Sequence, residues 1–204
     1  MMNALPNLIT TTRSASDASV LQSIGQPGVA LALWQRQLPD GLTDVLDALP
    51  IERLPSLRQR VGLGEVTSML VEACEVAGTG GATDDLVAWV ETLAHHAVRA
   101  FGSPFLEIRL DATEGQPCPK WHIDAVSARL LCTLRGPGTE YGPIGTSGQP
   151  RSIHRMARGE VGIFRGALWP GGELSAIVHR SPPAAAGGPR LLIVIDPAHE
   201  CECC

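Results

Sequence analysis

Pro119-Lys120-Trp121-His122-Ile123-Asp124 places a histidine and a carboxylate two residues apart. In a β-strand, residues two apart project from the same face, so these two side chains can reach one point. A second histidine, His179, follows 57 residues later (179 − 122 = 57). Two histidines and one carboxylate divided in this way are typical of a facial ligand set for non-haem Fe(II). His122, Asp124 and His179 are therefore predicted to be metal ligands and catalytic residues.

Arg190 is the next feature that points to this site. It stands 11 residues after His179 (190 − 179 = 11) and begins the apolar run Arg190-Leu-Leu-Ile-Val-Ile195. A guanidinium group binds a carboxylate through two parallel hydrogen bonds, which a 2-oxoglutarate-dependent oxygenase needs for the distal carboxylate of its co-substrate. Arg190 is predicted to bind this cofactor, although an arginine at the start of a strand also suits a surface ion pair.

A second pair of polar residues lies on the predicted strand 128–134. Arg129 and Thr133 are separated by two steps of two residues, so they share one face of that strand. If this face points inward, both residues can contribute to binding of the co-substrate carboxylate. If it points outward, they are solvated.

The order of the predicted elements indicates an α+β fold. Helical spacing of apolar residues occurs near 42–49, over 65–77 and after Thr83, whereas short strands follow from Phe105 to Ile195. Helices followed by many short strands predict a double-stranded β-helix, a jelly-roll or cupin-like barrel, with N-terminal helices packed outside. A further short helix is expected over 55–61, and the Gly/Pro-rich segment 136–150 is expected to be a loop that acts as a lid.

Four regions are predicted along the chain. Residues 1–27 are polar and are expected to be a flexible leader, and residues 28–104 a mainly helical part packed on the barrel. Residues 105–197 form the barrel core that carries the metal site, and residues 198–204 form a cysteine-rich tail. Cys201, Cys203 and Cys204 of this tail are soft ligands and candidates for a second metal site, although the paired spacing of a structural zinc site is missing.

The composition limits the partners and the location. The net charge is −5 and no run of five or more basic residues occurs, so we expect no nucleic acid partner. The apolar runs are much shorter than the roughly 20 residues that cross a membrane, and no signal peptide is recognised. A cytoplasmic protein that contacts no membrane is the expectation.

The segment around the His-x-Asp pair also carries a family resemblance. Cys118-Pro-Lys-Trp-His-Ile-Asp124, together with Arg129-Leu-Leu-Cys-Thr-Leu-Arg-Gly-Pro-Gly-Thr-Glu140, resembles the bacterial domain of unknown function 1826 family. The likeness covers most of the chain after about residue 28 and is most specific around 118–140 and 174–196. This resemblance implies a connection with zinc homeostasis and no particular activity.

A more remote resemblance concerns the order of the site residues. His122, Asp124, His179 and Arg190, in this order, are similar to the Fe(II)/2-oxoglutarate-dependent oxygenase superfamily. That resemblance implies metal binding by the first three residues and co-substrate binding by Arg190. The superfamily often has Ser or Thr two residues after the arginine, where this chain has Leu192, so one carboxylate hydrogen bond is missing from the pattern.

Two functions of different classes follow. The first is an Fe(II)/2-oxoglutarate-dependent oxygenase-like protein that hydroxylates an unidentified small molecule or protein. The second is a non-enzymatic, zinc-handling protein that uses the His-Asp-His triad, the Cys201–Cys204 tail or both, with Zn in place of Fe(II). A zinc hydrolase is a third use of the same ligands, but it needs a separate general base, and only His154 and Glu160 are near in sequence.

Overall fold

Strict alternation in three neighbouring strands gives the main sheet two different faces. Strand β12 (Arg190–Ala198) lies between β5 (Phe105–Thr113) and β6 (Ala128–Arg135) and runs antiparallel to both. Leu191, Ile193 and Ile195 of β12 are fully buried beneath the helices. The residues between them face the opposite side, because successive side chains of a strand alternate. Apolar packing on one face thus places the intervening side chains of all three strands on the other.

A computed structural model describes residues 7–198, except the side chain of Ala186. The main sheet has seven strands in the order β2-β3-β9-β6-β12-β5-β4, and a second sheet has the order β11-β7-β8. The remaining strands are β1 (Asn7–Ile9), β2 (Thr11–Ala15), β3 (Val29–Trp34), β4 (Leu57–Gly62), β7 (Glu140–Pro143), β8 (His154–Arg155), β9 (Val161–Arg165), β10 (Glu173–Ser175) and β11 (Ile177–Arg180).

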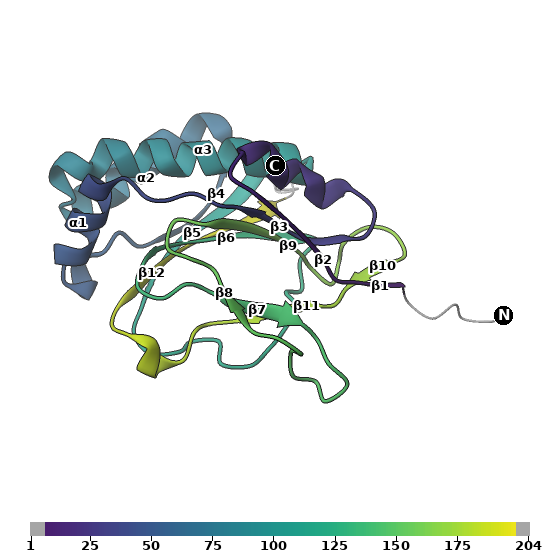
Figure 1. Ribbon diagram of the computed structural model, residues 1–204. Helices are drawn as coiled ribbons and strands as arrows, with labels where there is room; N and C mark the ends of the chain where they lie inside the picture. The colour runs from purple at the N-terminus through teal and green to yellow at the C-terminus, as the bar shows by residue number, and fades with distance from the viewer. Residues whose placement is uncertain (1–6, 199–204) are drawn as a thin grey trace.

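Three helices cover one face of the main sheet (Figure 1). They are α1 (Asp40–Ala48), α2 (Val66–Ala77) and α3 (Thr83–Phe101). The predicted apolar stripes point into the core, with Leu70 of α2 and Leu86, Val90 and Leu93 of α3 fully buried. Burial of each such side chain stabilises the fold by about 1.5–3 kcal/mol. No helix in residues 7–198 is long and apolar enough to span a bilayer.

The small sheet lies across the other face of the main sheet, and an apolar cluster fills part of the space between them (Figure 1). Leu131 and Val194 from the main sheet meet Ile177 of β11 and Phe164 of β9 in this cluster. Two facing sheets of mainly antiparallel strands, with helices outside, form a jelly-roll of the double-stranded β-helix type. The predicted α+β fold is confirmed.

The expected flexible leader is wrong for residues 7–27, while residues 1–6 lie outside the described part. β1 pairs in parallel with β10, and β2 pairs in parallel with β3 at the edge of the main sheet. A 3₁₀-helix, Ala18–Gly25, then buries Leu21 and Ile24 completely. Two apolar side chains at helical spacing were enough to fix this segment to the core despite its polar composition.

Two further expectations need correction. Residues 55–61 do not form a helix, because β4 pairs with β5 along the edge of the main sheet. Strands β3 and β4 therefore place part of region 28–104 inside the barrel, and no boundary separates a helical part from it. The Gly/Pro-rich segment 136–150 contains β7, the central strand of the small sheet, and so forms a wall of the barrel rather than a lid.

Candidate metal centre

A short β-bridge brings His122 and His179 together. His179 lies in β11, whereas His122 belongs to an irregular segment and not to the predicted strand. The backbone N–H of His122 donates to the carbonyl oxygen of His179 at 3.1 Å, and the reverse bond measures 3.0 Å. Residues that exchange both bonds lie directly opposite each other in an antiparallel pair. The two imidazole centroids are consequently only 4.5 Å apart.

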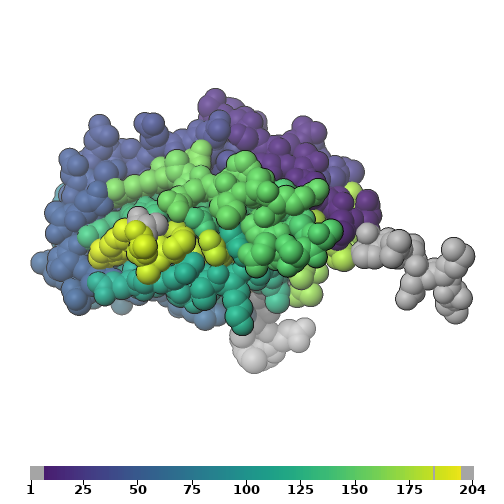
Figure 2. Space-filling view, turned by 60° about the horizontal axis from the view of Figure 1, so that its bottom comes forward, coloured from purple at the N-terminus to yellow at the C-terminus, as the bar shows by residue number. Residues whose placement is uncertain are grey.

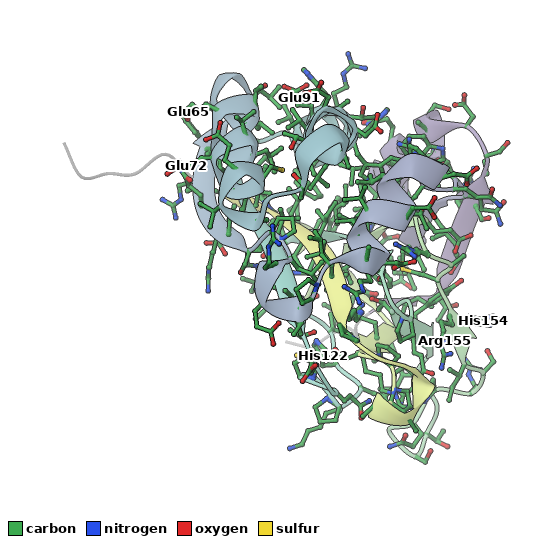
Figure 3. The ribbon with its side chains drawn as sticks, turned by 90° about the vertical axis from the view of Figure 1, so that its left-hand side faces the viewer. Glu65, Glu72, Glu91, His122, His154 and Arg155 are labelled. Carbon is green, nitrogen blue, oxygen red and sulfur yellow. The ribbon has the colours of Figure 1, made fainter. Side chains whose placement is uncertain are left out.

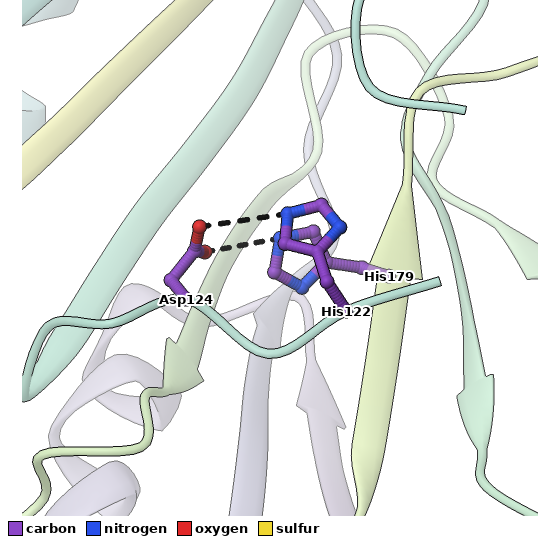
Figure 4. A group of neighbouring side chains, drawn as sticks. All are labelled: His122, Asp124 and His179. Carbon is purple, nitrogen blue, oxygen red and sulfur yellow. Dashed lines mark ion pairs between the residues drawn. The ribbon is translucent and has the colours of Figure 1, made fainter. Parts of the chain in front are cut away.

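Asp124 completes the group from the loop that follows (Figure 4). Its Oδ2 lies 3.0 Å from Nε2 of His179, and its Oδ1 lies 3.6 Å from Nε2 of His122. One ligand atom of each residue lies within 4.8 Å of the others. Figure 3 shows that His122 is on the strand side of the molecule, away from the helical layer that carries Glu72 and Glu91. The structure thus brings the three predicted ligands together.

Backbone contacts with Gly166 and Ala167, which follow β9, hold Asp124 in place. Ala167 donates its backbone N–H to the carbonyl oxygen of Asp124 at 2.8 Å, and Gly166 donates to Ser127 at 2.8 Å. Gly166 permits this approach because an added Cβ would lie 1.9 Å from the carbonyl oxygen of Val126. The end of β9 therefore supports the carboxylate through its backbone.

Substitution Gly166→Ala tests this support. We expect a loss of about 1–3 kcal/mol in the free energy of unfolding, as for other overpacked sites, together with weaker metal binding. Urea unfolding and a Mn(II) titration measure the two effects. Gly172→Ala is the matched control, because an added Cβ there meets no atom within 4 Å. Equal behaviour of both variants would contradict the role of Gly166.

The charge states of the triad suit a metal ion. Burial alone would raise the pKa of Asp124, but contacts with His122, His179 and Arg129 together hold this pKa well below its usual value. Burial lowers the pKa of His179, whereas the Asp124 carboxylate raises the pKa of His122. Asp124 is therefore ionised and His179 neutral at pH 7, which are the forms that bind metals.

The hydrogen bonds of the triad also leave ligand atoms free to bind a metal. Nδ1 of His122 lies 2.9 Å from the carbonyl oxygen of Lys120, an acceptor, so Nδ1 carries a proton and Nε2, which points toward Asp124, is the nitrogen left for a metal. This arrangement is the usual outer contact of a metal-bound histidine. Oδ2 of Asp124 is buried and has no hydrogen-bond partner within the described residues. An unpartnered buried oxygen beside Nε2 of His179, in a group whose third ligand atom lies within 4.8 Å, fits a divalent ion held by His122, Asp124 and His179.

Arg129 is close to the triad but is not free to bind a co-substrate. Its Nε and Nη2 donate to both oxygens of Asp196 at 2.7 and 2.6 Å, and its Nη1 donates to Oδ1 of Asp124. Of the two orientations that the sequence left open, Arg129 takes the inward one, but all three of its nitrogens are already engaged. Its expected cofactor-binding role is therefore corrected to contact with Asp124.

Arg190 occupies a different environment. It is only 4% exposed, and within the described residues no carboxylate oxygen lies within 4.0 Å of it. Its Nη2 donates to the hydroxyls of Thr139 at 2.8 Å and Thr133 at 3.3 Å, and its Nε donates to the carbonyl of Pro137. Burial lowers the pKa of Arg190 to about 10. Thr133 therefore orients Arg190, and this buried cation forms no ion pair within the described residues, although the Asp111 carboxylate across the cavity attracts it.

A cavity of about 150 Å³ joins Arg190 to His122 and His179 of the triad. The main sheet supplies its wall through alternate residues of β5, β6 and β12, as the alternation of the strands requires. On the surface above, segments from the teal, green and yellow parts of the chain meet (Figure 2). The lining includes Arg109, Asp111, Cys118, His122, Arg129, Leu131, Thr139, His179, Arg180, Arg190, Leu192 and Val194.

Two contributors were missed by the sequence analysis. Asp196 ends the apolar run of β12 and is 5% exposed, and a carboxylate in such a run signals a buried partner. Thr139 had no signal, since it lies in the Gly/Pro-rich segment expected to be a lid. The candidate ligands Cys201, Cys203 and Cys204 lie outside the described residues, so the second metal site stays a prediction.

The sequence of the chain matches a known protein family. The family model described as "Protein of unknown function (DUF1826)" matches residues 15–196. The chain belongs to this family. No curated protein matches this DUF1826 member in sequence.

Solved structures resemble this DUF1826 member in fold. The dioxygenase for auxin oxidation 1 from Arabidopsis thaliana, in its 2-oxoglutarate complex, aligns with a TM-score of 0.53 and 11% identity over 94% of this chain and 93% of that chain. The rice dioxygenase for auxin oxidation aligns with a TM-score of 0.50 and 14% identity over 95% and 84%. The oxygenase-like double-stranded β-helix fold is thus shared at low sequence identity.

Cys118 gives a test of which thiols reach the cavity. Cys118 is exposed and lines the cavity, whereas Cys74 and Cys132 are buried, and burial raises the pKa of Cys132 to about 12. Thiolates are the reactive form, so iodoacetamide is expected to modify Cys118 in the native protein and the other two only after unfolding. Peptide mapping reads each site. Rapid native labelling of Cys132 would contradict the core packing.

Proposed function

We propose that this protein is an Fe(II)/2-oxoglutarate-dependent oxygenase that hydroxylates a small molecule or a protein. The observation that carries the proposal is Arg190, a buried cation with no carboxylate oxygen within 4.0 Å among the described residues, in a cavity that His122 and His179 of the triad also line. A buried charge is costly unless a partner compensates for it. A dicarboxylate that contacts the metal at one end and Arg190 at the other supplies that partner.

The surroundings of Arg190 support a carboxylate ligand. The hydroxyls of Thr133 and Thr139 accept from Nη2 and fix the plane of the guanidinium group. Thr133 pairs directly with Leu192 across the β6–β12 ladder. Thr133 does not line the cavity, so the hydroxyl that lines it beside Arg190 is that of Thr139.

Each residue then has a defined task. His122, Asp124 and His179 hold the metal, and Arg190 orients the distal carboxylate of 2-oxoglutarate by a pair of charge-assisted hydrogen bonds. When bound, Fe(II) supplies the redox chemistry that couples decarboxylation of 2-oxoglutarate by O₂ to hydroxylation of a substrate C–H bond, with succinate and CO₂ as co-products. Leu131, Leu192 and Val194 give the cavity an apolar wall that limits the access of water.

The size of the cavity bears on the substrate. Sites that enclose drug-sized ligands measure roughly 300–1,000 Å³, which exceeds the 150 Å³ of this cavity. The substrate is therefore proposed to present one group at the cavity mouth, as a small molecule or a protein side chain does. A cytoplasmic location, with no membrane or nucleic acid partner, stays a prediction of the sequence.

Zinc handling is the second candidate, because the same three ligands also suit Zn²⁺. It gives Arg190 no task, and for this reason we favour the oxygenase. A zinc hydrolase finds less support, since neither His154 nor Glu160 is among the residues that line the cavity.

A thermal-shift experiment tests the proposed function. A ligand that binds only the native state raises Tm, and the increase grows with the logarithm of the ratio of ligand concentration to Kd. With Mn(II) as a redox-silent probe, 2-oxoglutarate is expected to raise Tm, whereas glutarate, which has both carboxylates but no keto oxygen to chelate the metal, is expected to have a much smaller effect. Equal shifts with the two acids, or a 2-oxoglutarate shift that does not require Mn(II), would refute the proposal.

A further inference from the structure

Arg129 lies between two buried carboxylates and contacts only one oxygen of a metal ligand. We propose that Arg129 is a positioning residue that makes Asp124 bind its metal through a single oxygen atom. The inference rests on the proposed function for its consequence, since the positions left open on the metal are those that 2-oxoglutarate and O₂ require. The contacts of Asp196, Arg129 and Asp124 carry it.

Asp196 fixes the orientation of the guanidinium group. Both of its oxygens accept from Arg129, at 2.7 Å from Nε and 2.6 Å from Nη2, which is the paired geometry that aligns the two planes. Asp196 itself is buried in β12 and also lies 3.4 Å from Nη2 of Arg109. Arg129 lies on β6 but is held by a residue of the neighbouring strand β12, and this contact fixes the direction in which its Nη1 points.

Nη1 of Arg129 points to Oδ1 of Asp124. Nη1 of Arg129 donates to Oδ1, while Oδ2 faces Nε2 of His179 and accepts no hydrogen bond within the described residues. The two oxygens of one carboxylate are thus in unequal environments. A charge-assisted hydrogen bond occupies the first oxygen and leaves the second for a metal. The asymmetry comes from Arg129. Within the described residues, the other side chains paired with Asp124 are the two histidines of the triad.

The number of Asp124 oxygens that bind the ion determines how many of its coordination positions stay open. An octahedral ion has six positions, and three protein atoms leave three open. A co-substrate that chelates through two atoms then leaves one position for O₂. If Asp124 bound through both oxygens, only two positions would be open, and the chelate would fill them. Arg129 is thus proposed to preserve the position that O₂ needs.

The experiment counts water on the metal and uses no co-substrate. Mn(II) is bound to the intact protein, and line broadening of its electron paramagnetic resonance signal in ¹⁷O-labelled water gives the number of coordinated waters. Three waters are expected in the wild type, as for three protein ligand atoms. Arg129→Met is expected to lose one of them, because Oδ1 is released to bind the ion.

Arg109→Met is the matched control. Arg109 lines the same cavity and also pairs with Asp196, but it forms no ion pair with Asp124. Its replacement removes the same charge and is expected to retain all three waters. If Arg129→Met does not fold, the double variant Arg129→Met with Asp196→Asn removes the unpaired carboxylate and carries the same expectation of one lost water.

Three results would overturn the inference: two waters in the wild type, no lost water in a folded Arg129 variant, or an equal loss in Arg109→Met. Failure of the proposed function gives a different result. In that case the water counts follow the expectation, but 2-oxoglutarate displaces no water from the wild-type Mn(II) complex. A wild-type protein that binds no Mn(II) would refute both proposals at once.

Discussion

Replacing His179 by alanine is expected to abolish tight metal binding. His179 is 5% exposed, and its Nε2 lies 3.0 Å from Oδ2 of Asp124, so it provides one of the three metal ligands found in residues 7–198. Changes to residues that merely support metal ligands lower the affinity by about 10–100-fold. Loss of a ligand itself is therefore expected to lower Mn(II) or Fe(II) affinity by roughly 100-fold or more. Isothermal titration calorimetry measures the change.

His95→Ala is the control for this substitution. His95 is an exposed histidine on α3, in the helical layer, so the same chemical change there removes no ligand. It is expected to leave the metal affinity unchanged. Circular dichroism and the Tm of the metal-free protein separate loss of a ligand from loss of fold. A folded His179→Ala variant that binds Mn(II) as tightly as the wild type would contradict the site.

Replacing Arg190 by methionine is expected to separate co-substrate binding from metal binding. Two charge-assisted hydrogen bonds to a carboxylate contribute about 1.5 kcal/mol each, so the affinity for 2-oxoglutarate is expected to fall roughly 100-fold. Metal affinity is expected to persist, because Arg190 is not part of the triad. The free energy of unfolding is expected to change little, because removal of a costly buried charge offsets the loss of its hydrogen bonds to Pro137, Thr133 and Thr139.

Titration of 2-oxoglutarate into the Mn(II)-loaded variant measures this effect. Arg60→Met removes an arginine from the exposed surface of β4 and is expected to preserve the wild-type affinity. Arg180→Met is a stricter comparison, because Arg180 lines the cavity but already pairs with Glu140 at 2.9 Å. If Arg180→Met weakened binding as much as Arg190→Met, the general positive charge of the cavity would explain the binding, and Arg190 would have no special role.

The sequence predicted the parts of this molecule that depend on periodicity. The strand predicted from the apolar run that begins at Arg190 is β12, and its alternate residues Arg190, Leu192 and Val194 line the cavity. The helical spacing of apolar residues predicted buried faces for the helices, and Leu70 and Leu86 are indeed buried in the core between the helices and the main sheet. The convergence of His122 and Asp124 was also predicted, although the supposed strand around them is an irregular segment fixed by one bridge to β11.

Long-range pairing was beyond such reasoning. The main sheet recruits β2, β3 and β4 from regions expected to be a leader and a helical part, because strand pairing depends on distant partners. The role of Arg129 was missed for the same reason, since Asp196 lies 67 residues away in sequence. Local pattern gives the face on which a side chain lies, but only the register of neighbouring strands shows which side chain it meets.

Anaerobic titration of the metal-free protein with Fe(II) and then 2-oxoglutarate tests the central claim most directly. A bidentate chelate of 2-oxoglutarate on Fe(II) gives a weak visible charge-transfer absorption. We expect this band to appear in the wild type at one equivalent of each component, to disappear in His179→Ala and to require roughly 100-fold more 2-oxoglutarate in Arg190→Met. A protein that binds Fe(II) but shows no band at saturating 2-oxoglutarate would contradict the oxygenase and favour metal handling instead.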